Sequence, residues 1–339
     1  MPLSSPRGEG ARRQAGQDAQ PLCVEEYYRS HIAPLVEPYE TLRLEKWEQT
    51  KRRGVVGCGL CLAYLVAAIV ILQASLGFSG TTLEWAGFGF AALVGLLFAW
   101  YRRPASQLRK AIKSEIFPKV FSFLGDDFDY RPKPPYRVKS LQESGLIPSH
   151  TSESSEDYIA GSHQGVKIEL LETKLKRKQK KKTITVFKGM LVRLSMNKSF
   201  SGKTIVTEDK GAIGNWLGEA ASTFSSLERV RLEDPLFEDR YQIYSDDQVE
   251  ARYLLTPAFM ERLMQLSTIA NLRHAKDPIE CSFYENKLLL KIPLTDNRFE
   301  TAHISKPIDF RGDMNQLLEE MNEIFSIIDI LKLNQRTGL

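Results

Sequence analysis

The stretch VKIELLETKLKRKQKKKTITVFKGMLVRL, residues 166–194, decides how the second half of this chain folds. Its two ends, VKIELLETKLK and TITVFKGMLVRL, alternate apolar and polar residues, and the second is rich in β-branched side chains, as is typical of strands. Seven cations fall within the nine residues between Lys174 and Lys182. They are Lys174, Lys176, Arg177, Lys178, Lys180, Lys181 and Lys182. We therefore expect a β-hairpin with residues 176–182 at its tip, where the charges are solvated and protect the strand edges from further pairing.

This cationic run accounts for the basic character of the whole chain. The 339 residues carry a formal net charge of +4, which would become −3 without the seven cations. Nucleic-acid-binding domains usually spread cations over a face and interleave them with aromatic residues, and the run contains no aromatic residue. We therefore expect no nucleic-acid partner, and nucleic-acid binding through the basic tip remains the weakest alternative.

Two apolar runs lie upstream of the hairpin. The first is GVVGCGLCLAYLVAAIVILQASLGF, residues 54–78, and the second is LEWAGFGFAALVGLLFAWY, residues 83–101, whose only charged residue is Glu84. At 1.5 Å per residue, each is long enough for a transmembrane helix across a hydrocarbon core about 30 Å thick. Lys and Arg flank the pair at residues 51–53 and 102–103, and the connecting loop has none. The positive-inside rule then predicts that both termini face the cytoplasm.

Small residues mark both predicted spans. Gly87, Ala91 and Gly95 recur every fourth residue on the second span, a pattern that serves either packing within the hairpin or dimerisation. Cys58 and Cys61 form a C-x-x-C pair in the first span, but no further ligand lies nearby to complete a zinc site. We interpret them as small helix residues, with redox chemistry or palmitoylation as alternatives, and we expect no cofactor and no metal.

The remaining segments complete the predicted organisation. We expect a disordered tail over residues 1–21, cytoplasmic helices over 22–53, an amphipathic juxtamembrane helix over 104–125, a connector over 126–156 and a cytoplasmic domain over 157–333. Proline inside the first helical segment, at Pro38, should divide it into two helices. The fold class is therefore α+β: N-terminal helices, a transmembrane helical hairpin, a mainly antiparallel sheet and a C-terminal amphipathic helix.

Within the cytoplasmic domain, short apolar segments predict further strands and two helices. RVRLEDP, FEDRYQIYS and EARYLLT, between residues 229 and 256, are interpreted as strands, and Glu285–Asn286 as a hairpin turn. Thr256 and Pro257 predict the start of one helix, and residues 313–333 predict the amphipathic C-terminal helix.

The sequence contains few motifs that are typical of catalytic or ligand-binding sites. The tripeptide Gly202-Lys203-Thr204 lacks the upstream glycine of a P-loop, and the strand-like sequence after it lacks the helix that a P-loop needs. The acidic group Asp246, Asp247 and Glu250 is interpreted as solvated surface, with cation binding or a cap for the segment before YLLTP as the alternatives. We predict no catalytic residues.

Two blocks carry a resemblance, FKGMLVRLSMNKSFSGKTIV and RLEDPLFEDRYQIYSDDQVEARYLLTPAFMERL. Together with the predicted membrane hairpin they resemble an uncharacterised bacterial family of two-span membrane proteins, catalogued as a domain of unknown function. The most specific motif is YSDDQVEARYLLTPAFMERL. The resemblance implies a bacterial cytoplasmic membrane protein and supplies no reaction and no site residues.

These observations favour a membrane-anchored, cytoplasm-facing binding or adaptor protein. The seven cations of the hairpin tip are the candidate contact with anionic lipid headgroups or with an acidic protein partner. An enzyme acting on a lipid or envelope precursor is the alternative, because many enzymes carry no recognisable short motif.

Overall fold

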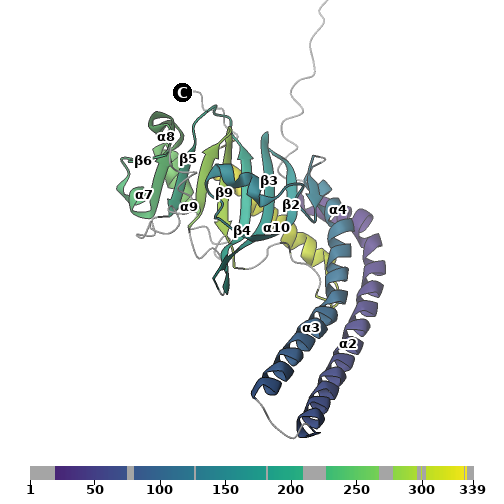
Figure 1. Ribbon diagram of the computed structural model, residues 1–339. Helices are drawn as coiled ribbons and strands as arrows, with labels where there is room; N and C mark the ends of the chain where they lie inside the picture. Colours follow the sequence, from purple (N-terminus) through teal and green to yellow (C-terminus); the bar gives the residue numbers. More distant parts are fainter. Residues whose placement is uncertain are drawn as a thin grey trace, which may run out of the picture. The chain divides into compact units, whose positions relative to one another are not determined.

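The computed structural model describes residues 20–74, 80–125, 127–180, 182–208, 227–266, 278–295, 299, 303–331 and 333 (Figure 1). The predicted disordered tail, residues 1–21, lies almost entirely outside the described residues, as does Lys181. The chain divides into two compact units, one made of residues 1–123 and 301–313, the other of residues 124–300 and 314–339.

Long helices dominate the first unit. They are α1 (Gln20–Tyr27), the π-helical turn η1 (Tyr28–Ile32), α2 (Ala33–Ala74), α3 (Gly80–Glu115) and α4 (Phe117–Leu124), whose last residue belongs to the second unit. Figure 1 shows α2 and α3 side by side as a hairpin. Both contain apolar stretches long enough to cross a membrane, and none of the residues in those stretches is buried within the protein.

Two expected helix breaks are absent. Pro38 lies inside α2 and Pro104 lies inside α3, so the helices next to the spans continue into them without interruption. A proline removes only one intrahelical hydrogen bond, and Pro38 lies near the start of its helix, where little of the helix precedes it. Tyr39 is buried next to it, and its hydroxyl donates to the Ala111 carbonyl of α3 at 3.4 Å. Packing between helices thus outweighs the local cost of proline.

The small residues of the second span lie outside the hairpin interface. Gly57 and Cys61 lie on the less exposed side of α2, and the Tyr64 hydroxyl donates to the Ala86 carbonyl of α3 at 2.8 Å. On α3, Gly87 and Gly95 are exposed, and a Cβ at either would meet no described atom within 4 Å. The interpretation of this ladder as packing within the hairpin is therefore wrong.

The second unit contains an antiparallel sheet, which confirms the predicted α+β class. In the described residues its strands are β1 (Asp129–Arg131), β2 (Ser152–His163), β3 (Val166–Gln179), β4 (Lys182–Ser195), β5 (Thr204–Glu208), β6 (Glu228–Val230), β7 (Tyr241–Ser245), β8 (Glu280–Tyr284) and β9 (Lys287–Pro293). They are ordered β1-β2-β3-β4-β9-β8-β5-β7-β6. The Glu285–Asn286 turn joins β8 to β9 with positive φ at both residues, as a type I′ turn requires.

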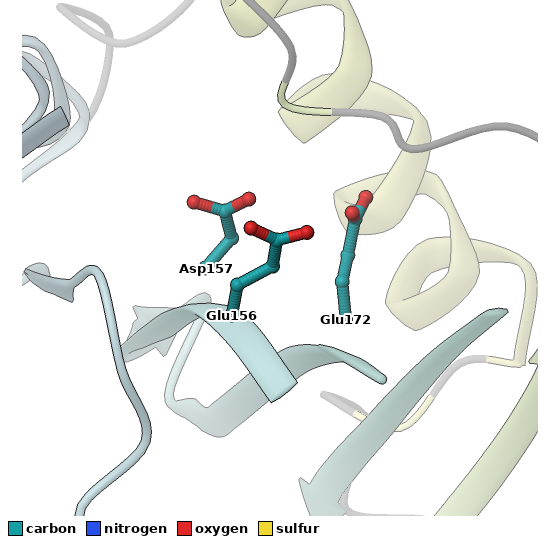
Figure 2. A group of neighbouring side chains, drawn as sticks. All are labelled: Glu156, Asp157 and Glu172. Atoms are coloured by element: carbon teal, nitrogen blue, oxygen red, sulfur yellow. The ribbon is translucent and has the colours of Figure 1, made fainter. Parts of the chain in front are cut away.

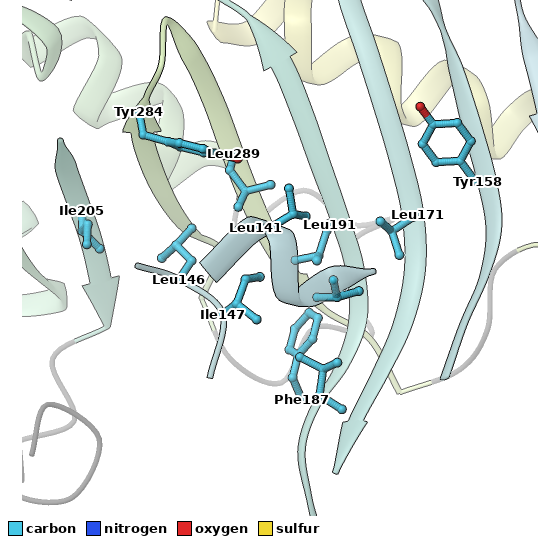
Figure 3. Packing of buried hydrophobic residues seen from close by; sticks show 12 residues of the cluster. Leu141, Leu146, Ile147, Tyr158, Leu171, Phe187, Leu191, Ile205, Tyr284 and Leu289 are labelled. Carbon is cyan, nitrogen blue, oxygen red and sulfur yellow. The ribbon is translucent and has the colours of Figure 1, made fainter. Parts of the chain in front are cut away.

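Helical elements cover the sheet. They are the 3₁₀ helix η2 (Val138–Ser144), α7 (Pro235–Arg240), α8 (Gln248–Leu254), α9 (Pro257–Leu266) and the C-terminal α10 (Phe310–Leu331), whose first four residues belong to the first unit. Figure 3 shows a buried cluster between the η2 segment and the strands. Its members include Val138, Leu141, Leu146, Ile147, Leu171, Leu175, Phe187, Leu191 and Leu289. The stretch expected as a connector, residues 126–156, thus contributes β1, η2 and part of β2 to the packed domain.

Two segments expected as strands are helical in whole or in part. Residues 235–240 form α7, so only residues 241–245 of FEDRYQIYS form the expected strand, β7, and most of EARYLLT forms α8. Asp234 caps α7 by accepting from the backbone N–H groups of Leu236 and Phe237, and Asp247 caps α8 by accepting from Val249 and Glu250. N-terminal caps of this kind stabilise a helix start by about 1 kcal/mol, which is enough to override weak strand propensity in short segments.

Candidate functional site

The β3–β4 hairpin extends beyond its neighbours in the sheet as a two-stranded ribbon. β3 and β4 pair out to Gln179 and Lys182. On one side the β2 pairing ends at Lys176, and on the other the β9 pairing ends at Gly189. The ribbon, defined here as residues 176–185, therefore has no flanking strand for most of its length, and Figure 1 shows it projecting past the ends of the adjacent strands. This confirms the predicted hairpin geometry of the cationic run.

Cations occupy both faces of the ribbon. Because side chains alternate along a strand, Lys174, Lys176 and Lys178 share one face, whereas Arg177 lies on the other. Lys182 is paired with Gln179 and so lies on the Arg177 face, and Lys180 occupies the turn with a positive φ. The buried apolar contacts end at Leu175 and Phe187, so the ribbon itself has no core side.

Few groups compensate this charge. Within the described part of the chain, Lys176, Lys178, Lys180 and Lys182 are exposed and form no ion pair. The ribbon is held at its base by Thr151, whose N–H donates to the Lys176 carbonyl at 2.8 Å, while its hydroxyl accepts from the Lys178 N–H at 3.0 Å. The lysine ammonium groups are thus free to contact an anionic surface.

An acidic cluster lies near the base of the ribbon. Figure 2 shows the carboxylates of Glu156 and Asp157 from β2 and Glu172 from β3 pointing toward one another. Each offers an oxygen within 4.8 Å of the others. Asp157 and Glu172 are buried, and Glu156 is exposed. Carboxylates in this arrangement suit a cationic group, either a hard metal ion or an ammonium.

The bulge in β2 brings Asp157 into this cluster. The β2–β3 register shifts between Glu156 and Ile159, and Asp157 has a φ of 56°. The buried Tyr130 hydroxyl donates to Asp157 Oδ1 at 2.6 Å. Burial and the negative charge of Asp157 both raise the pKa of Tyr130, so the phenol stays protonated and remains a donor.

A pocket of about 200 Å³ adjoins the cluster. Its lining residues are Ser154, Glu156, Glu172, Thr173, Lys174, Lys188, Gly189 and Leu294. Strand register arranges their charges in two rows. Glu156 pairs with Glu172, and two residues along the strands Lys174 pairs with Lys188. The Lys188 ammonium also donates to the Thr295 carbonyl, which holds it in place. The pocket therefore presents negative charge on one side and positive charge on the other.

Of the six predicted cations that the structure describes, only Lys174 lines this pocket. The carboxylates were not among the predicted site residues, because Glu156 lay in the expected connector and Glu172 lay in a predicted strand segment to which no role was given. Alternation offered a signal, since Ile168, Leu170 and Glu172 lie on the same face of β3, and the first two are apolar and buried. An acidic residue in line with buried ones indicates a polar group within the folded domain.

The acidic residues after β7 have two roles: Asp247 caps α8, which was one of the alternatives for this group, whereas Asp246 and Glu250 bind a loop. Glu250 accepts hydrogen bonds from the backbone N–H groups of Ser201 at 2.9 Å and Gly202 at 2.6 Å, and Asp246 accepts from Lys203 at 2.6 Å. The loop before β5, which resembles part of a P-loop, thus directs its amides at protein carboxylates. Asp246 is exposed, as expected, and Glu250 is half-buried, and both also bind the loop that enters β5.

We expect Glu250→Ala to lower thermal stability, because two backbone N–H groups lose their acceptor. The hydrogen bond from Ser201 is exposed and the one from Gly202 is part-buried, so water replaces part of what is lost. We expect a loss of about 0.5–1.5 kcal/mol, or roughly 1–6 °C in Tm at about 2–4 °C per kcal/mol. Thermal unfolding of the detergent-solubilised chain, followed by circular dichroism, measures the change. Glu261→Ala on α9 is the matched control, since Glu261 is exposed and, among the described residues, accepts a hydrogen bond from the Gln265 side chain alone. Equal Tm values for the two variants would contradict the loop-binding role.

Comparisons with known proteins give one structural and one sequence relationship. The chain is similar to the crystal structure of the mycobacterial trehalose monomycolate transport factor A, TtfA, with 10% sequence identity and a TM-score of 0.32. That match covers 60% of this chain and 88% of the other. Among curated proteins, no relative was found. The model of a family described as "Protein of unknown function (DUF3137)" matches residues 185–333, which leaves the seven cations outside the match and confirms that this segment is a domain of unknown function.

Proposed function

We propose that this chain is a membrane-anchored binding or adaptor protein that faces the cytoplasm of a bacterium, and that its ribbon contacts anionic lipid headgroups. The proposal rests on the position and charge of the ribbon. It projects beyond the neighbouring strands, has cations on both faces, and lacks local ion pairs for Lys176, Lys178, Lys180 and Lys182 among the described residues. Packing of the hydrophobic core does not require an exposed cationic ribbon. Contact with lipid phosphates does use cationic side chains, because they form strong charge-assisted hydrogen bonds with phosphate oxygens.

The helical hairpin supports the anchoring part of the proposal. α2 and α3 contain apolar stretches that expose large side chains along most of their circumference, among them Leu62, Val66, Ile71, Trp85, Phe88 and Leu96. In water such a surface would be very unfavourable, whereas in a bilayer it is solvated by lipid tails. Arg53 and Arg102 flank these stretches, which favours cytoplasmic placement of both ends in the inner membrane.

The energy of the proposed contact is moderate. Each Lys or Arg near an anionic leaflet contributes about 1 kcal/mol. Screening limits that attraction to within about 8 Å of the surface at physiological ionic strength. Several ribbon cations together therefore give a contact that is reversible and sensitive to salt, as expected of an accessory contact in a protein already anchored by its hairpin.

We expect the ribbon lysines to be protected from chemical modification by an anionic bilayer. The full chain is reconstituted in nanodiscs of phosphatidylcholine, with or without phosphatidylglycerol, and acylation of Lys176, Lys178 and Lys180 is followed by mass spectrometry. Phosphatidylglycerol should slow their acylation by roughly threefold or more, and about 0.5 M NaCl should remove the difference.

Lys139 on η2 is the internal control, because it is exposed and lies outside the ribbon. Its acylation should be the same in both kinds of nanodisc. Identical rates for the ribbon lysines in both membranes would exclude the lipid contact and leave an acidic protein as the partner of the ribbon.

The pocket beside Glu172 favours a second candidate function, that of an enzyme acting on a lipid or envelope precursor. A polar cavity is the minimum that such an enzyme needs. The residues that line this one include carboxylates and lysines, which are able to act as acids or bases. Turnover of a radiolabelled envelope precursor by purified protein, abolished by Glu172→Gln, would establish this alternative.

A further inference from the structure

We propose that the pocket at the base of the ribbon binds a small zwitterion carrying a primary ammonium and a phosphate. An ethanolamine phospholipid headgroup and a free aminoalkyl phosphate share this chemistry. The inference goes beyond the ribbon–lipid contact and stands without it, because no residue that lines the pocket belongs to the ribbon, residues 176–185.

The charged residues of the pocket form two rows of opposite sign. Glu156 and Glu172 are direct cross-strand partners, as are Lys174 and Lys188 in the next row toward the ribbon. Rows two residues apart along a strand are separated by roughly 6.7 Å. A ligand with one charge would be attracted by one row and repelled by the other. A ligand with both charges satisfies both rows in a single orientation.

Lys174 and Lys188 keep N–H donors that a ligand anion can use. The Lys188 ammonium donates to the Thr295 carbonyl, and a lysine has further donors for a ligand oxygen. In the part of the chain that the structure describes, Lys174 forms no ion pair and no side-chain hydrogen bond, although the neighbouring row is acidic. Lys174 and Lys188 are both half-buried residues, so an anion held between them would be partly shielded from water and from salt.

The volume of the pocket also suits a small ligand. A volume of about 200 Å³ is below the range of roughly 300–1,000 Å³ that holds drug-sized ligands. An aminoalkyl phosphate, in which an ethylene group separates ammonium from phosphate, spans the two rows better than an α-amino acid, whose charged groups share one carbon. Leu294 supplies an apolar wall for the ethylene group, and Ser154 and Thr173 supply hydroxyls. A metal ion at the carboxylates would instead face repulsion from Lys174.

The test is calorimetric titration of the full chain in detergent micelles with O-phosphoethanolamine. We expect saturable binding, and at least tenfold weaker binding of ethanolamine and of ethyl phosphate, each of which carries only one of the two charges. Equal binding of ethyl phosphate and O-phosphoethanolamine would overturn the proposal, as would binding of Ca²⁺ or Mg²⁺ in the absence of any O-phosphoethanolamine binding.

Variants test the two rows separately. Glu172→Gln and Lys174→Gln should each weaken O-phosphoethanolamine binding at least tenfold. Glu156→Gln changes an exposed member of the acidic row, so it gives the same test if Glu172→Gln fails to fold. Lys139→Gln is the matched control, because it removes an exposed cation outside both the pocket and the ribbon and should leave binding unchanged. Unchanged affinity in all three pocket variants would overturn the proposal.

Nanodiscs distinguish the two sources of the ligand. If a lipid headgroup occupies the pocket, phosphatidylethanolamine nanodiscs should weaken binding of free O-phosphoethanolamine compared with phosphatidylglycerol nanodiscs. If a free metabolite is the ligand, affinity should be the same in both, and either result supports the proposal. Loss of binding in both kinds of nanodisc would overturn it. Lysine protection by phosphatidylglycerol reports on the ribbon alone, so each proposal is able to fail without the other.

Discussion

Replacing Gly189 with alanine will lower the Tm of the domain by roughly 6–12 °C or prevent folding. An added Cβ would overlap the Ile292 carbonyl oxygen and stand 2.9 Å from the Leu294 nitrogen and the Pro293 Cα. These are backbone atoms of β9 and the residue after it, and the Leu294 N–H donates to the Lys188 carbonyl at 3.0 Å. Relief of the overlap requires separation of β4 from β9, in the middle of the sheet. Overpacking of this kind costs about 3 kcal/mol or more, at roughly 2–4 °C per kcal/mol.

Gly95→Ala is the control for this prediction. Gly95 lies on the exposed side of α3, and a Cβ there would meet no described atom within 4 Å. Alanine is also the better helix former, so the Tm should not fall. Thermal unfolding of both variants in the same detergent gives the comparison. A Gly189→Ala protein with the Tm of the parent would show that β9 does not approach β4 as closely as described.

Replacing Lys291 with methionine will produce a comparable loss and will reverse the pH dependence of stability. Lys291 on β9 forms an ion pair with Glu280 on β8, and both side chains are largely buried. Thr207 Oγ1 also donates to Glu280 Oε1 at 2.6 Å. Removal of one partner from a buried pair leaves the other charge uncompensated and costs about 3–5 kcal/mol. The double variant Glu280→Gln with Lys291→Met should recover much of this loss, because no buried charge remains.

The pH dependence follows from the pKa of Glu280. Burial by itself raises this pKa, but Lys291 and the hydrogen bonds from Thr207 and the Glu208 N–H outweigh it, so the pKa is lowered. A lowered folded-state pKa contributes stability that is present above the unfolded value of about 4.5 and is lost as pH falls through the folded value. The parent protein should therefore lose this contribution only in acid, below about pH 4.5.

In the Lys291→Met variant the largest lowering influence is gone, and burial should raise the pKa of Glu280 above its unfolded value. The charged form then destabilises the fold, so the Tm should rise as pH is lowered from 7 toward 5, where protonation relieves the buried charge. Unfolding scans at several pH values measure the sign of the slope. A Tm that falls with pH over this range in the variant would contradict the assignment of Lys291 as the compensating charge.

Local sequence patterns predicted much of this fold. The two apolar runs, the alternating segments around the cationic run and the Glu285–Asn286 turn all lie in contiguous sequence, and each local rule selects one structure. The ribbon was predictable for the same reason, because its strands are adjacent in the chain. Where local rules competed, as in the helices α7 and α8, the caps Asp234 and Asp247 prevailed over strand propensity.

The sequence by itself determined the membrane-length helices, the α+β class and the cationic hairpin, because these depend on periodicity and charge within short windows. Tertiary structure alone decided that β4 pairs with β9, about a hundred residues away, which makes Gly189 indispensable. It also decided that Glu250 binds the loop before β5 and that Glu156 meets Glu172 beside Lys174 and Lys188. Those arrangements arise from strand register and from the need of buried polar groups for partners, and neither is encoded in any one segment.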